Sequence, residues 1–205
     1  MTFSVYIDTD RWRAHQKQVL ADLPGLVPVA KGNGYGVGNA RLAAESGSLG
    51  VDTIAVGTAR EVDQVAGGFT GDILVLTPVL PGADAGSVDP VGDDDRTILT
   101  VAQVPTLTAL PAGSRVVVEC RTSMNRHGVR PDELAAVSDA SRHLQVEGVA
   151  LHLPLDRPGD VDPVAETDGW VSRVGDAGLP TATMWVSHLS GPELAGLRSR
   201  HPHIT

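Results

Sequence analysis

The chain has 205 residues, of which 41% are hydrophobic and only 3% aromatic, with a formal net charge of −9 and an isoelectric point of about 5.1. This length and composition suit one globular domain. The acidic balance argues against nucleic acid or an anionic membrane as the main partner, and no apolar run approaches the roughly 18–20 residues that a bilayer span needs. A single cysteine, Cys120, excludes an internal disulfide, and the N-terminus has no signal-like core. We therefore expect a cytoplasmic protein.

The predicted elements alternate between helical patterns and short apolar runs. An opening helix over 10–21 is followed by apolar runs at 26–31, 53–57, 72–77, 97–101, 115–120, 145–152 and 181–187. Helical patterns lie between these runs at 39–48, 59–66, 131–143 and 163–177, and another follows at 191–200. Nearly continuous apolar runs are typical of parallel strands that are buried on both faces. The alternation predicts an α/β fold with a parallel sheet.

Seven predicted strands fit either a doubly wound sheet or most of a (β/α)₈ barrel. The short helices and the even repeat favour the barrel of the TIM type, in which functional residues follow the carboxyl ends of the strands. An eighth strand would begin near Thr205, so we expect the barrel to lack this strand. An open parallel edge leaves backbone groups unpaired. A longer parent protein and association into a homodimer both stay open as explanations.

Lys31 ends the first predicted strand and opens a loop with glycine at every second position. These glycines are Gly32, Gly34, Gly36 and Gly38. A lysine at the end of a buried strand is poorly hydrated, and its neutral amine can form a Schiff base with a carbonyl compound. Glycines let backbone N–H groups approach a phosphate. Together these features suggest pyridoxal phosphate, whereas the alternative is a strand and a flexible turn with Lys31 in water.

Three segments resemble motifs of one known family. Segment 29–36, Val-Ala-Lys-Gly-Asn-Gly-Tyr-Gly, is similar to the family motif Val-Lys-Ala-Asn-Ala-Tyr-Gly-His. Segment 122–128, Thr-Ser-Met-Asn-Arg-His-Gly, is similar to Thr-Gly-Met-x-Arg-x-Gly. Segment 148–152, Gly-Val-Ala-Leu-His, is similar to Gly-(apolar)₃-His. Segments 55–61 and 72–76 resemble its second and third strands. The chain thus resembles, over nearly its whole length, the N-terminal barrel of the alanine racemase family, which are fold-type III pyridoxal phosphate enzymes.

The resemblance implies roles for five residues around the cofactor. Lys31 would bind pyridoxal 5′-phosphate and would act as one of two proton-transfer bases. Tyr35 would hydrogen-bond the phosphate, and Ser187 or His188 would lie near it. His152 would lie against the pyridine ring. The residues themselves leave open that His152 is a core histidine and that Ser187 is only a strand-end cap.

The same resemblance implies roles for residues near the substrate. Arg126 would face the phenolic oxygen of the cofactor, and Met124 would donate its backbone N–H near the substrate carboxylate. The family often has a carbamylated lysine where this chain has Glu119, so we expect Glu119 to interact with Arg126 and to orient its guanidinium. Arg121 adds a cation nearby, and a surface ion pair remains the alternative for Arg126. No metal site is expected.

These roles imply a pyridoxal-phosphate-dependent amino-acid racemase, an isomerase, or its N-terminal domain, which abstracts the Cα proton of an amino acid bound as an aldimine. The family's second base comes from a C-terminal β-domain, so we expect residues 1–205 to form one cofactor-binding domain without it. Racemisation by this chain alone is therefore doubtful, and the amino acid used stays open. Alternatives are a single-barrel pyridoxal phosphate homeostasis protein without racemase activity and a non-enzymatic phosphate-ligand domain.

Overall fold

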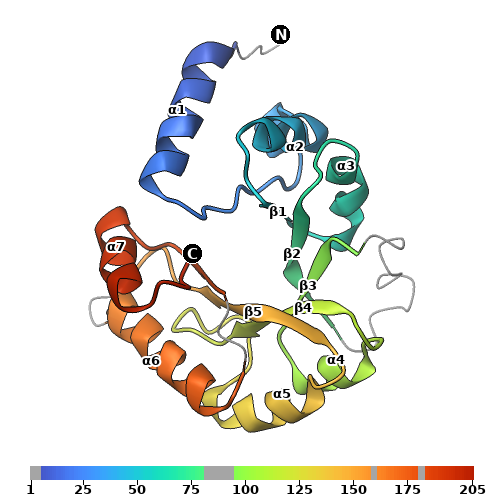
Figure 1. Cartoon of the computed structure of the whole chain (residues 1–205), viewed down its shortest axis with the longest axis vertical. Helices are drawn as coiled ribbons and strands as arrows, with labels where there is room; N and C mark the ends of the chain where they lie inside the picture. Colours follow the sequence, from blue (N-terminus) through green and yellow to red (C-terminus); the bar gives the residue numbers. More distant parts are fainter. Residues whose placement is uncertain (1–5, 81–94, 158–160, 180–182) are drawn as a thin grey trace.

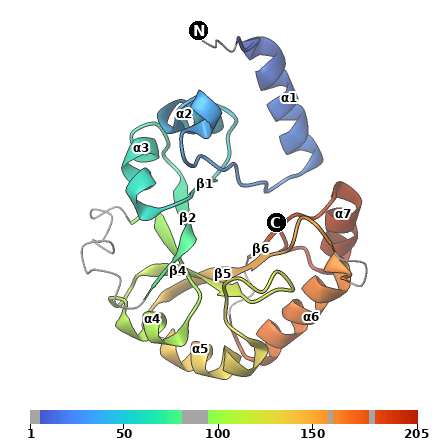
Figure 2. The same cartoon turned by 180° about the vertical axis from the view of Figure 1, so that it is seen from behind.

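The computed structural model describes residues 6–80, 95–157, 161–179 and 183–205. Within these ranges six parallel strands form one sheet in chain order, and the sheet curls with helices around its outer side (Figures 1 and 2). The strands are β1 (Thr53–Val56), β2 (Asp72–Val79), β3 (Thr97–Val101), β4 (Arg115–Cys120), β5 (Gln145–His152) and β6 (Met184–Ser187). The predicted α/β class and parallel sheet are confirmed, with six strands in place of seven.

The helices lie between the strands largely where the sequence predicts them. They are α1 (Thr9–Asp22), α2 (Asn39–Ser48), α3 (Val62–Ala66), α4 (Val104–Ala109), α5 (Leu134–Ala140), α6 (Pro163–Asp176) and α7 (Gly191–Arg200). Helix α4 was not predicted, because it is short and rich in β-branched residues of low helix propensity. Pro105 suits its first turn, and Leu107 is fully buried, so tertiary packing explains this helix.

The predicted strand over 26–31 is wrong as a strand, because only Val29 forms a bridge, with Ala55 of β1. Two backbone hydrogen bonds of 2.8 Å make this bridge, from Ala30 N to Ala55 O and from Ala55 N to Pro28 O. Proline has no N–H to donate to a ladder. Pro28 therefore contributes only its carbonyl to the edge of the sheet.

The other edge of the sheet pairs with the last residues of the chain. Met184 N donates to His203 O at 3.0 Å, and Thr205 N donates to Met184 O at 2.8 Å, which gives a parallel bridge at Ile204. Thr205 Oγ1 donates to Gly25 O, so this segment also contacts the chain that leads to the first edge. The two edges of the curled sheet thus approach each other through side-chain contacts.

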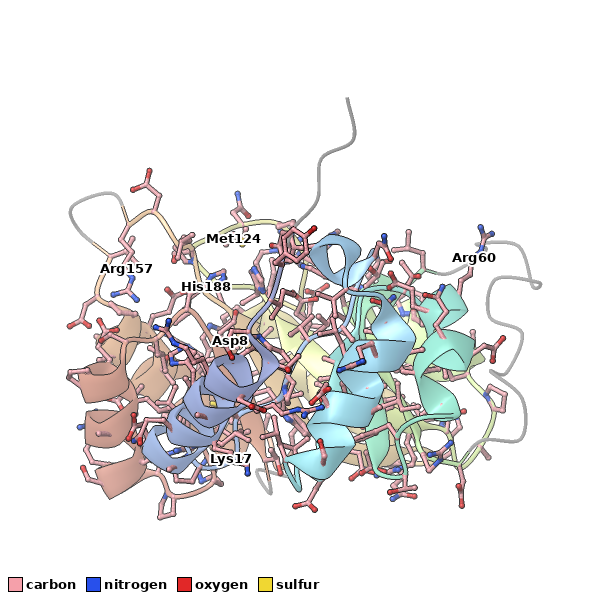
Figure 3. The ribbon with its side chains drawn as sticks, turned by 90° about the horizontal axis from the view of Figure 1, so that it is seen from above. Asp8, Lys17, Arg60, Met124, Arg157 and His188 are labelled. Atoms are coloured by element: carbon pink, nitrogen blue, oxygen red, sulfur yellow. The ribbon has the colours of Figure 1, made fainter. Side chains whose placement is uncertain are left out.

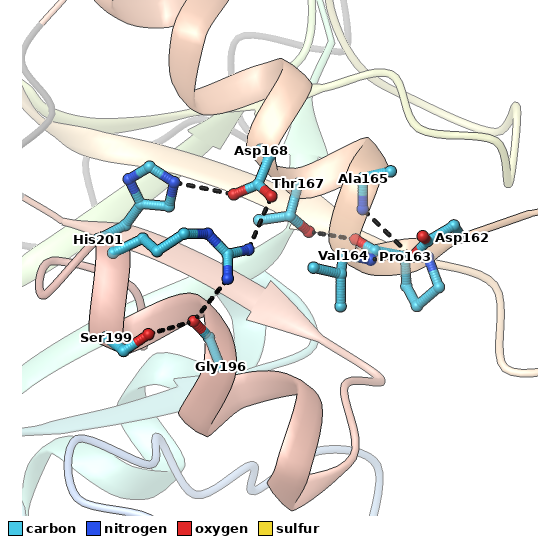
Figure 4. Close-up of polar contacts among 10 residues, drawn as sticks. Asp162, Pro163, Val164, Ala165, Thr167, Asp168, Gly196, Ser199 and His201 are labelled. Atoms are coloured by element: carbon cyan, nitrogen blue, oxygen red, sulfur yellow. Dashed lines mark hydrogen bonds and ion pairs between the residues drawn. The ribbon is translucent and has the colours of Figure 1, made fainter.

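Helices α6 and α7 pack side by side and are joined by polar contacts (Figure 4). Asp168 on α6 accepts from Arg200 Nη2 at 2.7 Å and from His201 Nε2 at 2.8 Å. Asp162 caps the start of α6 by accepting from Val164 N at 2.9 Å and also from the next amide (Figure 4). Because α7 leads directly into the segment that pairs with β6, these contacts support that edge of the sheet.

Alternate residues of the strands face opposite sides of the sheet. The outer face packs against the helices in two clusters centred on β4 and β5 and on β1 and β2. The inner cluster is smaller, with Ala55, Leu74, Ile98 and Val117 at its centre. This inner cluster has fewer buried residues than either outer cluster, and a cavity lies on the concave face beside it. Every helix in the described ranges is too short or too polar to cross a bilayer.

Candidate functional site

A cavity of about 560 Å³ lies on the inner face of the sheet and reaches the carboxyl ends of the strands. Its size is within the usual range for small-molecule sites. Its walls are mainly apolar, and its polar or ionisable lining residues include Lys31, Glu119, Arg126, His152, Ser187 and His188. Figure 3 shows that residues from several loops after the strands, including Met124 and His188, lie on one side of the molecule, whereas Lys17 of α1 lies on the other. The structure thus brings four of the predicted site residues, Lys31, Arg126, His152 and Ser187, to one cavity.

Lys31 is exposed, which corrects the expectation of a dehydrated lysine at the end of a buried strand. The reason is that the segment before it forms one bridge only, and Val29 is itself 49% exposed. The side chain nevertheless lines the cavity. A Cβ added at Gly57 would lie 3.2 Å from Lys31 Cβ, so the glycine at the end of β1 allows the lysine stem to lie close to the strand.

The loop after Lys31 is closed on itself by its own amides. Gly34 N donates to Lys31 O at 3.0 Å, and both Gly36 N and Gly38 N donate to Asn33 O, at 2.8 and 3.1 Å. The Gly32 amide donates to Glu61 Oε1 at 2.5 Å. The expectation of a ready cradle of glycine amides is therefore wrong for this conformation of the loop, because all four N–H groups have acceptors within the protein.

Tyr35 lies at the tip of this loop, fully exposed, with a positive φ of 55°. It is not among the residues that line the cavity. Glu61, which was not predicted as a site residue, lies in the helical turn Ala59–Glu61 after β1; it accepts from Gly32 N and also from Thr58 N, at 2.8 Å. The Thr-x-x-Glu capping box at 58–61 is a sequence signal that could have found it.

His152 ends β5 and is held by its neighbours on β6. Its Nδ1 lies 3.1 Å from Ser187 Oγ, and its ring meets the ring of His188 edge to face, with 4.8 Å between the centroids. Burial lowers the pKa of His152 to about 4, and the positive charges of Arg126 and Lys31 act in the same direction. The imidazole is therefore neutral near pH 7 and presents a flat, uncharged ring to the cavity.

Glu119 of β4 lies on the cavity wall with an exposed fraction of 6%. Burial raises the pKa of this carboxyl, and the nearby charge of Arg126 opposes that shift. Among the described residues no hydrogen bond or ion pair joins the Glu119 side chain to Arg126. The predicted interaction is therefore an electrostatic one across a gap, and Arg121 is exposed and lies outside the cavity lining.

The loop that contains Met124 is fixed by contacts of its own. Thr122 Oγ1 donates to His152 O at 2.5 Å and lies 3.3 Å from Met124 N, which donates to it. Ser123 donates through its amide and its hydroxyl to Glu166 on α6, at 2.5 and 2.7 Å. Met124 is not among the cavity-lining residues, and its amide, which was predicted to meet a substrate carboxylate, already has an acceptor.

The titratable groups of the described chain form no cluster of three or more His, Cys, Asp or Glu side chains that could hold a metal ion. The chemistry that the cavity offers is instead that of an accessible primary amine beside a guanidinium, a neutral imidazole and a hydroxyl. An amine of this kind can bond to a carbonyl compound, and the guanidinium can hold an anionic oxygen. Fold and cavity together define an α/β protein with a curled parallel sheet and a small-molecule site at its strand ends.

The chain belongs to the alanine racemase family, because the family profile described as alanine racemase, N-terminal domain, matches residues 7–168. Curated relatives include an alanine racemase of Desulfovibrio desulfuricans, 31% identical over 157 residues, and one of Symbiobacterium thermophilum, 30% identical over 167 residues. The matches cover 71% and 75% of this chain but 42% and 43% of those proteins. The match thus spans less than half the length of these relatives.

Solved structures show the same fold at lower identity. Alanine racemase from Corynebacterium glutamicum matches 94% of this chain with a TM-score of 0.70 and 23% identity, over 57% of its own chain. Alanine racemase from a D-cycloserine-producing Streptomyces lavendulae matches 96% of this chain with a TM-score of 0.71 and 22% identity, over 55% of its own chain. A D-threo-3-hydroxyaspartate dehydratase also matches, with a TM-score of 0.64 and 21% identity over 90% of this chain and 57% of its own.

Proposed function

We propose that the chain is the (β/α)₈-type barrel of a pyridoxal-phosphate-dependent amino-acid racemase, with Lys31 as the residue that bonds to the cofactor. The observation that supports this most is the single cavity that gathers Lys31, Arg126, His152 and Ser187 at the strand ends. Membership of the alanine racemase family, whose curated relatives are named alanine racemases, supports the same function. The substrate class would be amino acids.

The residues of the cavity fit this cofactor in size and charge. A volume of about 560 Å³ has room for a small ring compound, and the neutral ring of His152 is suited to pack beside an aromatic ring. Arg126 would hold an anionic oxygen of the cofactor, and Ser187 would donate near the phosphate. When bound, pyridoxal phosphate supplies an electron sink for the electron pair that remains when a Cα–H bond breaks.

Several residues of the chain would then have separate roles toward the cofactor and the substrate. Lys31 would hold the cofactor and move a proton at its Nζ atom, and Met124 would contact the substrate carboxylate. Tyr35 would reach the phosphate only after the loop 32–38 changes conformation, because its side chain now lies outside the cavity. We place this activity in the cytoplasm, with a second copy of the chain as a partner. These two parts of the proposal rest on the sequence alone.

A second function is favoured by one observation. The Met124 amide donates to Thr122 Oγ1, so the donor proposed for the substrate carboxylate is occupied. A barrel that binds pyridoxal phosphate but does not turn over an amino acid, as in a cofactor homeostasis protein, would not need that donor. The cavity residues that would hold the cofactor are the same in both functions.

Two measurements separate these functions. Titration of the chain with pyridoxal phosphate should give the absorbance of a lysine adduct in the wild type and in Lys17→Ala but not in Lys31→Ala. Incubation of the loaded protein with L-alanine, followed by chiral chromatography, should then yield D-alanine for a racemase and none for a homeostasis protein. Loss of the absorbance in Lys17→Ala with its retention in Lys31→Ala would contradict the cofactor proposal.

A further inference from the structure

His188 has a backbone conformation that is unfavourable for a residue with a Cβ. Its φ is 66°, and the other non-glycine residues with positive φ in the described ranges are Tyr35 and Asn125; all three residues are exposed. Such conformations persist where surrounding contacts determine them, and they concentrate at functional sites. His188 also lines the cavity, so the contacts that hold its backbone also fix part of the cavity wall.

Arg157 holds the backbone of His188 from the outer side. Its Nη2 donates to the His188 carbonyl oxygen, and its Nη1 donates to Glu193 Oε1 at 2.6 Å. Glu193 is fixed in turn, because its Oε2 accepts from Ser190 N at 2.7 Å in the capping box of α7. The Arg157 guanidinium holds the pKa of Glu193 down at about 2, so this pair is charged on both sides near pH 7.

The held backbone places the ring of His188 in one orientation. Its Nδ1 lies 2.6 Å from Leu153 O, and since a carbonyl only accepts, Nδ1 carries the proton. Its Nε2 has no partner among the described residues. The ring meets His152 edge to face at an interplanar angle of 74°, and His152 is itself held by Ser187. Two imidazoles thus form one wall of the cavity.

We propose that Arg157 is a positioning residue for this wall. Arg157 is paired with Glu193 and donates to the His188 carbonyl oxygen, and through this bond it keeps the His188 ring against His152 and keeps His152 half-buried and neutral. Arg157 does not line the cavity, and its side chain is 28% exposed. Partly exposed ion pairs contribute little to global stability, so the main effect of this one is local. A role of Arg157 in cofactor binding rests on the proposed function, whereas its effect on the pKa of His152 is measurable without a ligand.

The test is the pH titration of the histidine ring protons by NMR in the ligand-free chain. In Arg157→Gln, His188 is released, and the titration midpoint of His152 should rise from about 4 toward the ordinary histidine range, because the ring loses cover. The positive charges of Lys31 and Arg126 remain in place and oppose part of this rise. Arg157→Lys, which keeps one donor and the charge, should restore much of the wild-type midpoint.

Arg130→Gln is the matched control. Arg130 also pairs with a capping-box glutamate, Glu133 before α5, at 3.6 Å, but it lies away from the cavity. This variant should leave the midpoint of His152 unchanged. If Arg157→Gln does not fold, Glu193→Gln provides the second variant, since it keeps an acceptor for Ser190 N but removes the charge. It should move the midpoint in the same direction by a smaller amount.

An unchanged titration midpoint of His152 in the folded Arg157→Gln or Glu193→Gln variant would overturn the positioning role. An equal shift in Arg130→Gln would overturn it as well, because the effect would then not be specific to this ion pair. Failure of the cofactor proposal would look different. In that case Lys31 would form no adduct with pyridoxal phosphate, while the titration midpoint of His152 would still change in Arg157→Gln.

Discussion

Burial shifts the pKa of two ionisable side chains of the cavity wall in the direction that favours the neutral form. Burial raises the pKa of the Glu119 carboxyl and lowers the pKa of the His152 imidazole to about 4. Removing either group from water disfavours its charged form. Arg126 and Lys31 line the same cavity and offer their guanidinium and amino groups to a bound anion, while His152 offers an uncharged ring.

The first prediction at this scale concerns acid stability. The folded pKa of His152 is below its ordinary value of 6.5, so the unfolded chain binds more protons between these two values. The free energy of unfolding should consequently fall as pH drops from 6.5 toward 4. Urea unfolding at about pH 7 and about pH 5 measures this fall. His203, whose pKa burial also lowers, contributes in the same direction.

His152→Gln should make the free energy of unfolding less dependent on pH in this window. The control is His15→Gln, since His15 is exposed on α1 and should leave the pH dependence as it is in the wild type. Glu45 and Glu193, whose pKa values are lowered to about 2, lose their contributions only at lower pH. A pH dependence in His152→Gln equal to that of the wild type would contradict the half-buried, neutral state of His152.

The second prediction concerns Glu119. Replacing it by lysine would place a second cation near Arg126 at a buried position, without an acidic partner among the described residues. We expect the affinity for pyridoxal phosphate to fall about tenfold or more, together with a lower urea midpoint. Glu119→Gln keeps the shape without a charge and should bind nearly as the wild type does. Fluorescence titration gives both affinities, and equal affinity of Glu119→Lys and the wild type would refute the coupling to Arg126.

At the scale of elements, the packing of β5 against β6 depends on a glycine. Gly148 has φ of 154°, and a Cβ there would lie 2.0 Å from Thr183 O just before β6. Gly148→Ala should therefore destabilise the chain by about 2–3 kcal/mol, measured by urea unfolding. Gly175→Ala in α6, where an added Cβ meets nothing within 4 Å, should be neutral or stabilising by about 0.5–1 kcal/mol. Equal stability of the two variants would show that β5 and β6 do not pack this closely.

Elements with strong local signals could be predicted from the sequence. Apolar runs located β1, β3, β4 and β5 to within a residue or two, and helical patterns located α6 and α7. The segment 26–31 could not be resolved in this way, because its apolar composition fits a strand while Pro28 limits its pairing. Helix α4 was missed because its stability comes from burial of Leu107, which leaves no periodic pattern in six residues.

At the scale of the whole molecule, Arg198 connects the two edges of the curled sheet. Its guanidinium donates to Pro24 O, beside the first edge, and to Ile204 O at the last edge, at 2.8 Å. Arg198→Ala should destabilise the chain by about 1 kcal/mol, because a part-buried carbonyl at Ile204 and an exposed one at Pro24 lose a charged donor. Hydrogen exchange at the amides of Met184 and Thr205 should become faster.

The exposed Arg142 provides the control, since it pairs only with Asp139 in the described structure and lies away from both edges. Arg142→Ala should leave hydrogen exchange at Met184 and Thr205 as it is in the wild type. Unchanged exchange at these amides in Arg198→Ala would contradict the view that this arginine holds the edges together.

Part of the candidate site could be predicted from the sequence, namely the residues that follow the predicted strands. Residues that end strands of a parallel sheet meet at one edge, so Lys31, His152 and Ser187 could be assigned to a common site before the structure was known. Tyr35 and Met124 belong to loops whose local hydrogen bonds decide where they lie, and these bonds hold both outside the cavity. The exposure of Lys31 followed from the missing strand before it, for which Pro28 was the one sequence signal.

The most direct test of the proposed site uses the two lysines of the chain, Lys17 and Lys31. Lys17 is exposed on α1, does not line the cavity and lies on the opposite side of the molecule from Met124 (Figure 3), so it reports non-specific reaction within the same molecule. The protein would be mixed with one equivalent of pyridoxal phosphate, reduced with borohydride, digested and mapped by mass spectrometry. We predict that the label is found on Lys31 and is absent from Lys17. Equal labelling of both lysines, or labelling of Lys17 alone, would contradict a cofactor site at Lys31.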